Sequence, residues 1–135
     1  MDRPAITDPG AEAVRGFADA ITRGDIPAAL EVCHPDIEFH SVLAVSGRAY
    51  IGHPGIEQYF RDVASAWSEW RVDVHRVEPM PDGRVAIVMT MHFRGKESGA
   101  MLSEPTAHIW TLRDDRLLRN EPIRGADSQL RALGI

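Results

Sequence analysis

The sequence predicts an α+β fold in which helices cover one face of a curved antiparallel sheet. Helical spacing of apolar residues is confined to the first half of the 135-residue chain, and strand-like alternation follows Trp70 in four successive segments. The element order α–α–β–α–β–β–β–β, followed by a short helix, places the helices together on one face. A long twisted sheet of this kind curls. We therefore expect a cone closed by the helices, with a central cavity able to bind a ligand.

The first two helices follow directly from their apolar faces and end signals. Asp8-Pro9 is typical of a helix start, with the Asp8 side chain as cap, and one apolar face follows at Val14, Phe17, Ala18 and Ile21. Gly24 ends this helix and Asp25 caps a shorter one, which Pro35 terminates. Residues 1–7 are expected to form a flexible arm, and residues 8–135 a single domain.

The third helix is expected from Pro54, after a strand over 37–42 and a loop over 44–52. The strand is indicated by alternation, with Phe39 on the apolar side. The helix carries the strongest apolar stripe in the chain, made by Ile56, Tyr59, Phe60, Val63 and Trp67.

Alternation and turn residues divide the second half into four strands. They span 71–78, 84–94, 101–112 and 116–124, with turns at 81–83, 95–99 and 114–115. A short terminal helix is expected over 127–133.

Composition and motifs exclude several classes of function. A net charge of −5 without a basic patch argues against nucleic acid, and the short apolar runs argue against a membrane span. The start MDRPAITDPG lacks an apolar leader and Cys33 is the single cysteine, so we expect a cytoplasmic protein. The six histidines show no metal-ligand spacing, and no cofactor motif occurs, so neither a metal nor a cofactor is expected.

Four segments resemble SnoaL-like members of the nuclear-transport-factor-2-like superfamily. They are FADAITRGDIPAAL, GHPGIEQYF, AHIWTLRDDRLLR and LRALGI, and the likeness covers about residues 9–135. The resemblance implies the cone fold. It leaves the reaction open, because this fold hosts isomerases, polyketide cyclases, dehydratases, epoxide hydrolases and noncatalytic binders.

The residues that catalyse in ketosteroid isomerase are not carried by this chain. That related enzyme uses a tyrosine, a carboxylate base and a protonated aspartic acid. The resemblance places these groups at Phe17, Ser41 and Ala107. The final-strand aspartate of SnoaL-like cyclases would fall at Pro122, with Glu121 beside it. The isomerase chemistry is therefore not expected from these positions.

The same resemblance implies which side chains line the cavity. The expected lining set is Phe17, Phe39, Ser41, Tyr59, Trp67, Ile87, Met89, Met91, Ala107, Ile109, Leu118, Asn120 and Arg124. A bulge near Pro105 or Pro122 would reverse the facing of a strand. The candidate catalytic residues are His40, Tyr59 and Asn120, because an imidazole, a phenol and a buried amide are groups that move or hold protons and orient a ligand.

Opposite parity places Trp110 and His108 on the outer face of the sheet. Such groups suggest a covered surface, so a homodimer that buries Trp110 and His108 is expected. Two functions remain open. One is a cofactor-independent isomerase, cyclase or dehydratase acting on a small apolar or polycyclic metabolite, and the other is a noncatalytic binding or dimerisation module.

Overall fold

The computed structural model describes residues 8–41 and 48–124, and within them it shows the expected α+β fold. The elements are α1 Pro9–Arg23, α2 Ile26–Val32, β1 Cys33–Phe39, β2 Tyr50–Ile51, α3 Gly52–Ala66, β3 Trp67–Pro79, β4 Val85–Gly95, β5 Met101–Arg113 and β6 Arg116–Arg124. The expected arm over 1–7, the terminal helix over 127–133 and residues 44–47 of the loop over 44–52 lie outside the described residues.

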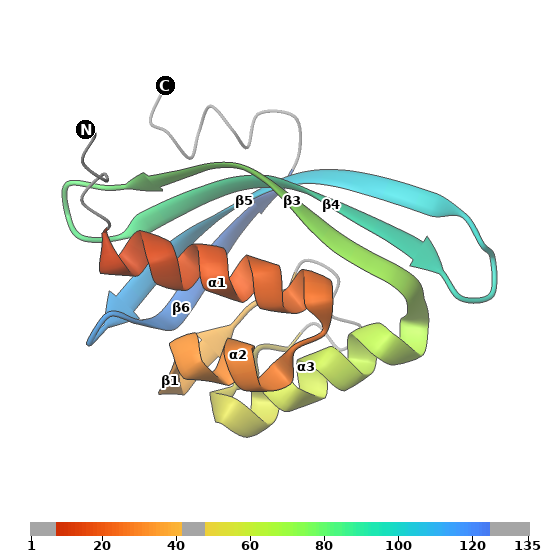
Figure 1. Ribbon diagram of the computed structural model, residues 1–135, viewed down its shortest axis with the longest axis horizontal. Coiled ribbons are helices and arrows are strands. Elements are labelled where there is room, and N and C mark those ends of the chain that lie inside the picture. The colour runs from red at the N-terminus through yellow and green to blue at the C-terminus, as the bar shows by residue number, and fades with distance from the viewer. Residues whose placement is uncertain (1–7, 42–47, 125–135) are drawn as a thin grey trace, which may run out of the picture.

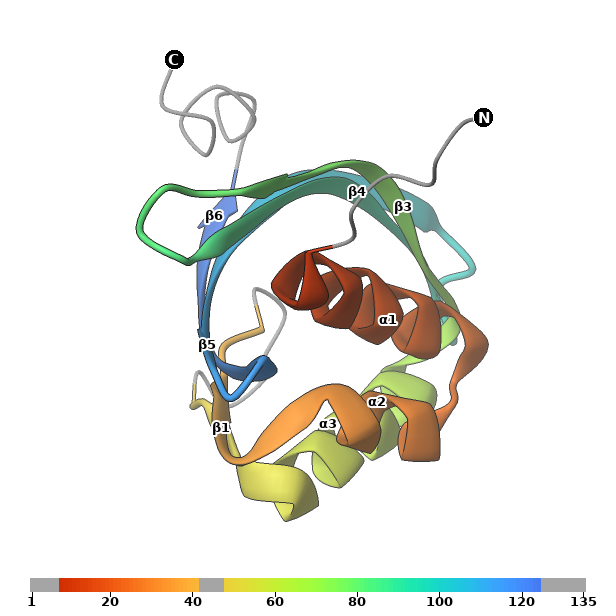
Figure 2. The same ribbon diagram turned by 60° about the vertical axis from the view of Figure 1, so that its left-hand side comes forward.

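The six strands form one curved sheet in the order β2-β1-β6-β5-β4-β3. The sheet bends around α1, while α2 and α3 close the open side (Figures 1 and 2). All neighbouring strands are antiparallel except β1 and β6, which are parallel. The expectation of a purely antiparallel sheet is wrong at this one pair, because the chain returns to β1 only after α3 and three further strands.

The helix ends confirm most of the predicted signals. Gly24 adopts a left-handed conformation with φ +68°, and its N–H donates to the carbonyls of Ala20 and Ile21. The Asp25 carboxylate accepts from the N–H of Ala28 at 3.1 Å. The Asp8 side chain makes no such bond, so α1 begins on the backbone carbonyl of Asp8 alone.

Trp67 begins β3 instead of ending α3, which corrects its predicted place on the helix. Its backbone pairs with Gly95 of β4, and its ring meets Phe93 edge-on with 4.8 Å between ring centroids. Packing across the strands therefore ends the helix at Ala66.

The register of β4 and β5 overturns the predicted facing of β5. Directly opposed residues of an antiparallel pair share a face. Ile87 lies opposite His108 and Val85 opposite Trp110, so His108 and Trp110 face the helices. The predicted dimer contact through these two residues is therefore wrong.

Ala107 and Ile109 consequently lie on the convex face of the sheet. They pack there with Ala86 and Val88 in a second apolar cluster. Their predicted place in the cavity wall is wrong, because Thr106, His108 and Trp110 take the inward positions of β5.

A bulge in β6 corrects a second prediction. The register between β5 and β6 shifts between Thr111 and Leu112. Leu112 then pairs with Leu117, which is fully buried, and Leu118 is half-buried outside the core. The predicted inward facing of Leu118 is wrong for this reason.

Beyond the bulge, β6 keeps the predicted inward register. Asn120 lies opposite Trp110, and Arg124 lies at the register position opposite Thr106. Within the described residues, no helix is long and apolar enough to cross a membrane.

Candidate functional site

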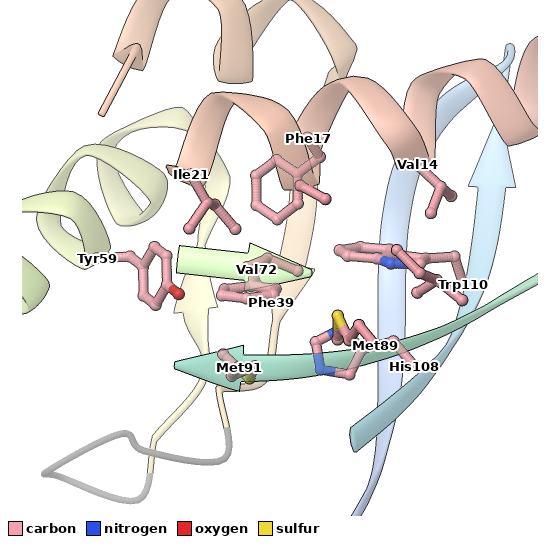
Figure 3. A pocket seen from close by; sticks show the side chains of 12 residues that line it. Val14, Phe17, Ile21, Phe39, Tyr59, Val72, Met89, Met91, His108 and Trp110 are labelled. Atoms are coloured by element: carbon pink, nitrogen blue, oxygen red, sulfur yellow. The ribbon is translucent and has the colours of Figure 1, made fainter. Parts of the chain in front are cut away.

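The interior between α1 and the concave face of the sheet contains a cavity. The space between its lining side chains measures about 330 Å³. Five elements besides α1 contribute to it, and Figure 3 shows the side chains turned toward one another across it. The lining residues are Val14, Phe17, Ala18, Ile21, Phe39, Tyr59, Val72, Ile87, Met89, Met91, His108 and Trp110.

Aromatic rings occupy most of this interior. The ring of Phe39 is stacked against Trp110 with 4° between the planes and 5.9 Å between centroids. Phe17 and Tyr59 meet Phe39 edge-on at 5.3 and 4.8 Å. The side chains leave room for about one water molecule in the cavity. The wide hollow cone expected from the resemblance is therefore largely filled.

A ligand larger than water must displace side chains. Met89 and Met91 are the lining residues best suited to this, because methionine is unbranched and changes rotamer at low cost. Both are buried on β4, at the side of the cavity opposite α1.

Two buried polar groups face this apolar space and have no hydrogen-bond partner among residues 8–41 and 48–124. They are the hydroxyl of Tyr59, whose residue is 2% exposed, and Nε2 of His108, whose residue is 5% exposed. An unpaired buried polar group lowers the stability of the fold by about 1–3 kcal/mol. A ligand that forms a hydrogen bond with either group would remove this cost. In the view of Figure 3, Phe39 lies between the two groups.

Burial keeps both groups uncharged. It lowers the pKa of His108 to about 4 and raises the pKa of Tyr59 far above its usual range. The neighbouring indole of Trp70 lowers the pKa of Tyr59, but burial outweighs it, and the indole Nε1 and the hydroxyl do not meet hydrogen-bond geometry. At neutral pH the cavity therefore offers a neutral imidazole and a neutral phenol.

Asn120 lies behind His108 and joins β6 to the end of β1. Its Oδ1 accepts from the backbone N–H of His40 at 2.6 Å, and its Nδ2 donates to the carbonyl of His40 at 2.8 Å. Nδ2 also lies 3.5 Å from Nδ1 of His108. Asn120 is 2% exposed, so its amide satisfies the backbone groups of His40 and contacts Nδ1 of His108 within the protein interior.

The side chain of His40 lies outside the cavity lining. Its Nε2 is 2.6 Å from the Glu38 carboxylate, and the ring side chain is 36% exposed. Glu38 in turn lies 3.8 Å from the Arg119 guanidinium. The structure therefore brings only the backbone of His40, and not its imidazole, to the site.

Ser41 and Trp67 line a second pocket on the other side of Tyr59. This pocket of about 280 Å³ also contains the Tyr50 hydroxyl, which donates to Asp62 at 2.6 Å. That bond lowers the pKa of the Asp62 carboxyl, so the carboxylate is ionised. Tyr59 is the lining residue that the two pockets share.

A wider groove at the ends of α1 and α3 adjoins both pockets. It measures about 870 Å³ and shares Ile21 with the cavity. It shares Val63, Trp67 and Trp70 with the second pocket. Through these shared residues, the groove reaches both interior pockets from the surface.

The positions carried over from ketosteroid isomerase are now placed. Phe17 lines the cavity, Ser41 lines the second pocket, and Ala107 lies on the convex face. Across the described ranges 8–41 and 48–124, no three metal-ligating side chains gather at one point.

Sequence reasoning missed His108 and Trp110 as lining residues. It predicted that both side chains face outward. Six other residues were predicted to line the cavity and do so: Phe17, Phe39, Tyr59, Ile87, Met89 and Met91. The useful signal for Val14, Ala18 and Ile21 was the apolar face of α1 itself, which had been assigned only to packing.

Solved structures with this fold include proteins that carry bound organic molecules. TerC, crystallised with polyporic acid, is 23% identical with a TM-score of 0.76 and covers 95% of this chain and 100% of its own. A ketosteroid-isomerase-like protein from Catenulispora acidiphila, in complex with trimethylamine, is 17% identical with a TM-score of 0.74, covering 92% and 93%.

A third similar structure comes from Shewanella denitrificans and is assigned provisionally to the SnoaL-like polyketide cyclases. It is 14% identical with a TM-score of 0.72, and covers 95% of this chain and 98% of its own. At these identities the likeness shows the fold. A comparison with curated proteins finds no significant match. The SnoaL-like domain model matches residues 14–120, and the chain therefore belongs to the SnoaL-like domain family.

Proposed function

We propose that this protein binds a small, flat, apolar metabolite through a carbonyl oxygen and polarises that carbonyl without a cofactor. The observation that carries the proposal is the unpartnered Nε2 of His108 in an aromatic cavity. The proposal is consistent with the polyketide cyclase activity that the name of the Shewanella denitrificans structure suggests.

The lining explains why the ligand would be flat and apolar. Phe17, Phe39 and Trp110 present ring faces and edges, which favour stacked or edge-on aromatic partners. Few polar atoms line this space, so a polar ligand would lose more hydrogen bonds to water than the cavity returns. The complexes of TerC and of the Catenulispora protein support binding of organic molecules by this fold.

Polarisation is the chemistry that these groups can supply. A hydrogen bond to a carbonyl oxygen stabilises the enolate that forms when an α-hydrogen leaves as a proton. Water or hydroxide takes that proton, and the enolate is reprotonated at carbon, so no oxidant or cofactor is consumed. A neutral imidazole is suited to such a donor role.

A specific observation favours a second candidate, a noncatalytic binder. No carboxylate lies among the described residues that line the cavity. Asp62 lines the second pocket instead, and its carboxylate already accepts from Tyr50 and Gln58. Proton abstraction would then fall to solvent alone.

Exchange of α-hydrogen into D₂O separates the two candidates. Binding of 2-tetralone, a small enolisable aryl ketone, would be measured by calorimetry, and loss of its α-hydrogen signals by proton NMR. Accelerated exchange that falls at least about tenfold in His108→Gln supports the polarising role. Binding with exchange at the buffer rate supports the binder.

The matched control is His92→Gln. His92 lies on the outer face of β4, away from the cavity, and contacts Ser103 and Asp73. It should bind and exchange as the unaltered protein does. If the unaltered protein binds neither 2-tetralone nor other small aryl ketones, the proposal fails.

A further inference from the structure

We propose that Asn120 holds His108 in the tautomer that carries its proton on Nε2, so that the cavity selects ligands whose oxygen accepts a hydrogen bond. The class is ketones, quinones and esters, in preference to alcohols and amines of the same shape. The ligand class rests on the proposed function above, whereas the tautomer rests on the structure alone.

The backbone of His40 sets the orientation of the Asn120 amide. A backbone N–H can only donate and a backbone carbonyl can only accept. The N–H lies 2.6 Å from Oδ1, and the carbonyl lies 2.8 Å from Nδ2. Turning the amide over would set Nδ2 against the N–H and Oδ1 against the carbonyl. Both bonds would then be lost.

The orientation of the amide decides the tautomer of His108. Nδ2 of Asn120 has hydrogens and accepts nothing, and it lies 3.5 Å from Nδ1 of His108. A proton on Nδ1 would point at those hydrogens, so Nδ1 must be the acceptor. In a neutral ring the proton is then on Nε2, the atom without a partner in the buried cavity.

The surroundings of the ring agree with a neutral donor. Apolar groups and Phe39 surround it, with 6.2 Å between the Phe39 and His108 centroids. The Trp110 ring lies 6.1 Å away by the same measure. Burial lowers the pKa of His108 to about 4, so the ring carries one proton at pH 7.

Selection between ligands follows from His108 more than from Tyr59. The Tyr59 hydroxyl both donates and accepts, so it suits either class of ligand. The Nε2–H of His108 only donates. An alcohol can still accept through its oxygen, but its own hydrogen then needs an acceptor close to His108, where the neighbouring rings of Phe39 and Trp110 offer none. We therefore expect a ketone to bind at least about tenfold more tightly than its alcohol.

The tautomer can be read in the unaltered protein by nitrogen-15 NMR. Two-bond proton–nitrogen spectra distinguish rings protonated at Nε2 from rings protonated at Nδ1. The His108 signals are identified by their loss in His108→Gln. The inference predicts an Nε2-protonated, neutral ring at pH 7. An Nδ1-protonated ring, or a charged one, overturns it.

The ligand arm uses 2-tetralone and 2-tetralol, compared by calorimetry. Asn120→Asp offers Nδ1 of His108 an acceptor and should move the proton from Nε2 to Nδ1, so the preference for the ketone should fall to within about threefold. The tautomer measured in that variant reports the change independently, and a far-ultraviolet spectrum checks its fold. The Nε2 tautomer of the unaltered protein is tested even if this variant does not fold.

The outcomes keep the two proposals apart. Equal affinity of the unaltered protein for ketone and alcohol overturns the selection inferred here, even though the protein binds. Absence of binding by both compounds overturns the proposed function, while the NMR spectrum still decides the tautomer.

Discussion

Replacing Asn120 with alanine should destabilise the protein by breaking the contact between β6 and the end of β1. The substitution removes the acceptor for the His40 N–H and the donor to the His40 carbonyl, at 2.6 and 2.8 Å. These two groups lie 80 residues from Asn120 in the chain and fasten the parallel strand pair of the sheet.

The magnitude follows from two backbone groups left without a partner. Each such group costs about 1–3 kcal/mol when it is buried. His40 is only half-buried, so water can partly replace the amide, and the sum is expected at about 2–4 kcal/mol. With a urea slope of about 2 kcal/mol/M, the unfolding midpoint should fall by about 1–2 M.

Urea unfolding followed by tryptophan fluorescence and circular dichroism measures this loss. Arg119→Ala is the matched control on the same strand, because its side chain is 62% exposed and its Nε lies 3.8 Å from the Glu38 carboxylate. That control should lose no more than about 1 kcal/mol. If Asn120→Ala loses no more than the control at an unchanged slope, the two backbone bonds do not stabilise the fold as argued.

Three further predictions concern packing, reactivity and pH. Gly55→Ala should destabilise the protein by about 1–3 kcal/mol, because the new Cβ would lie 2.8 Å from the Tyr50 carbonyl carbon. In the control Gly16→Ala, the new Cβ meets nothing closer than 3.6 Å, so this variant should be neutral or stabilising in thermal melts. The buried Cys33 thiol, whose pKa burial raises to about 12, should resist a thiol-specific disulfide reagent at pH 8 and react fully in urea; prompt native reaction would contradict its burial. Because burial lowers the pKa of His108 from 6.5 to about 4, unfolding takes up a proton in that window, so stability should fall as pH drops through it, by up to about 1.4 kcal/mol per pH unit. His108→Gln should lack this component of the urea-derived pH profile; identical slopes would contradict it.

The sequence predicts the facing of side chains well in elements that expose one face to solvent and bury the other. The α1 stripe and the inward residues Ile87, Met89 and Met91 of β4 follow from such patterns. Gly24 and Asp25 likewise carry their own local signals.

The facing of β5 could not be predicted in this way. Every residue from Thr106 to Trp110 is buried, so both faces of the strand are covered and alternation carries no information. The apolar Ala107 and Ile109 then look like the inward pair, although the register with β4 turns His108 inward. The parallel pairing of β1 with β6 is likewise set by contacts distant in sequence.

The candidate site was hidden for a related reason. The polar contacts behind the cavity join His40, Asn120 and His108, which meet only in the folded chain. In the sequence, Asn120 is a lone amide and His40 is more conspicuous as a titrating side chain. The structure instead uses the backbone of His40 and the imidazole of His108.

Methionine methyl NMR tests ligand binding in the cavity most directly. Met89 and Met91 line the cavity, whereas Met80 packs beside the convex cluster and Met101 is exposed at 41%. On titration with 2-tetralone, ring currents should shift the Met89 and Met91 methyl signals and leave those of Met80 and Met101 in place. Unmoved Met89 and Met91 signals at a ligand concentration that saturates binding in calorimetry would contradict the account.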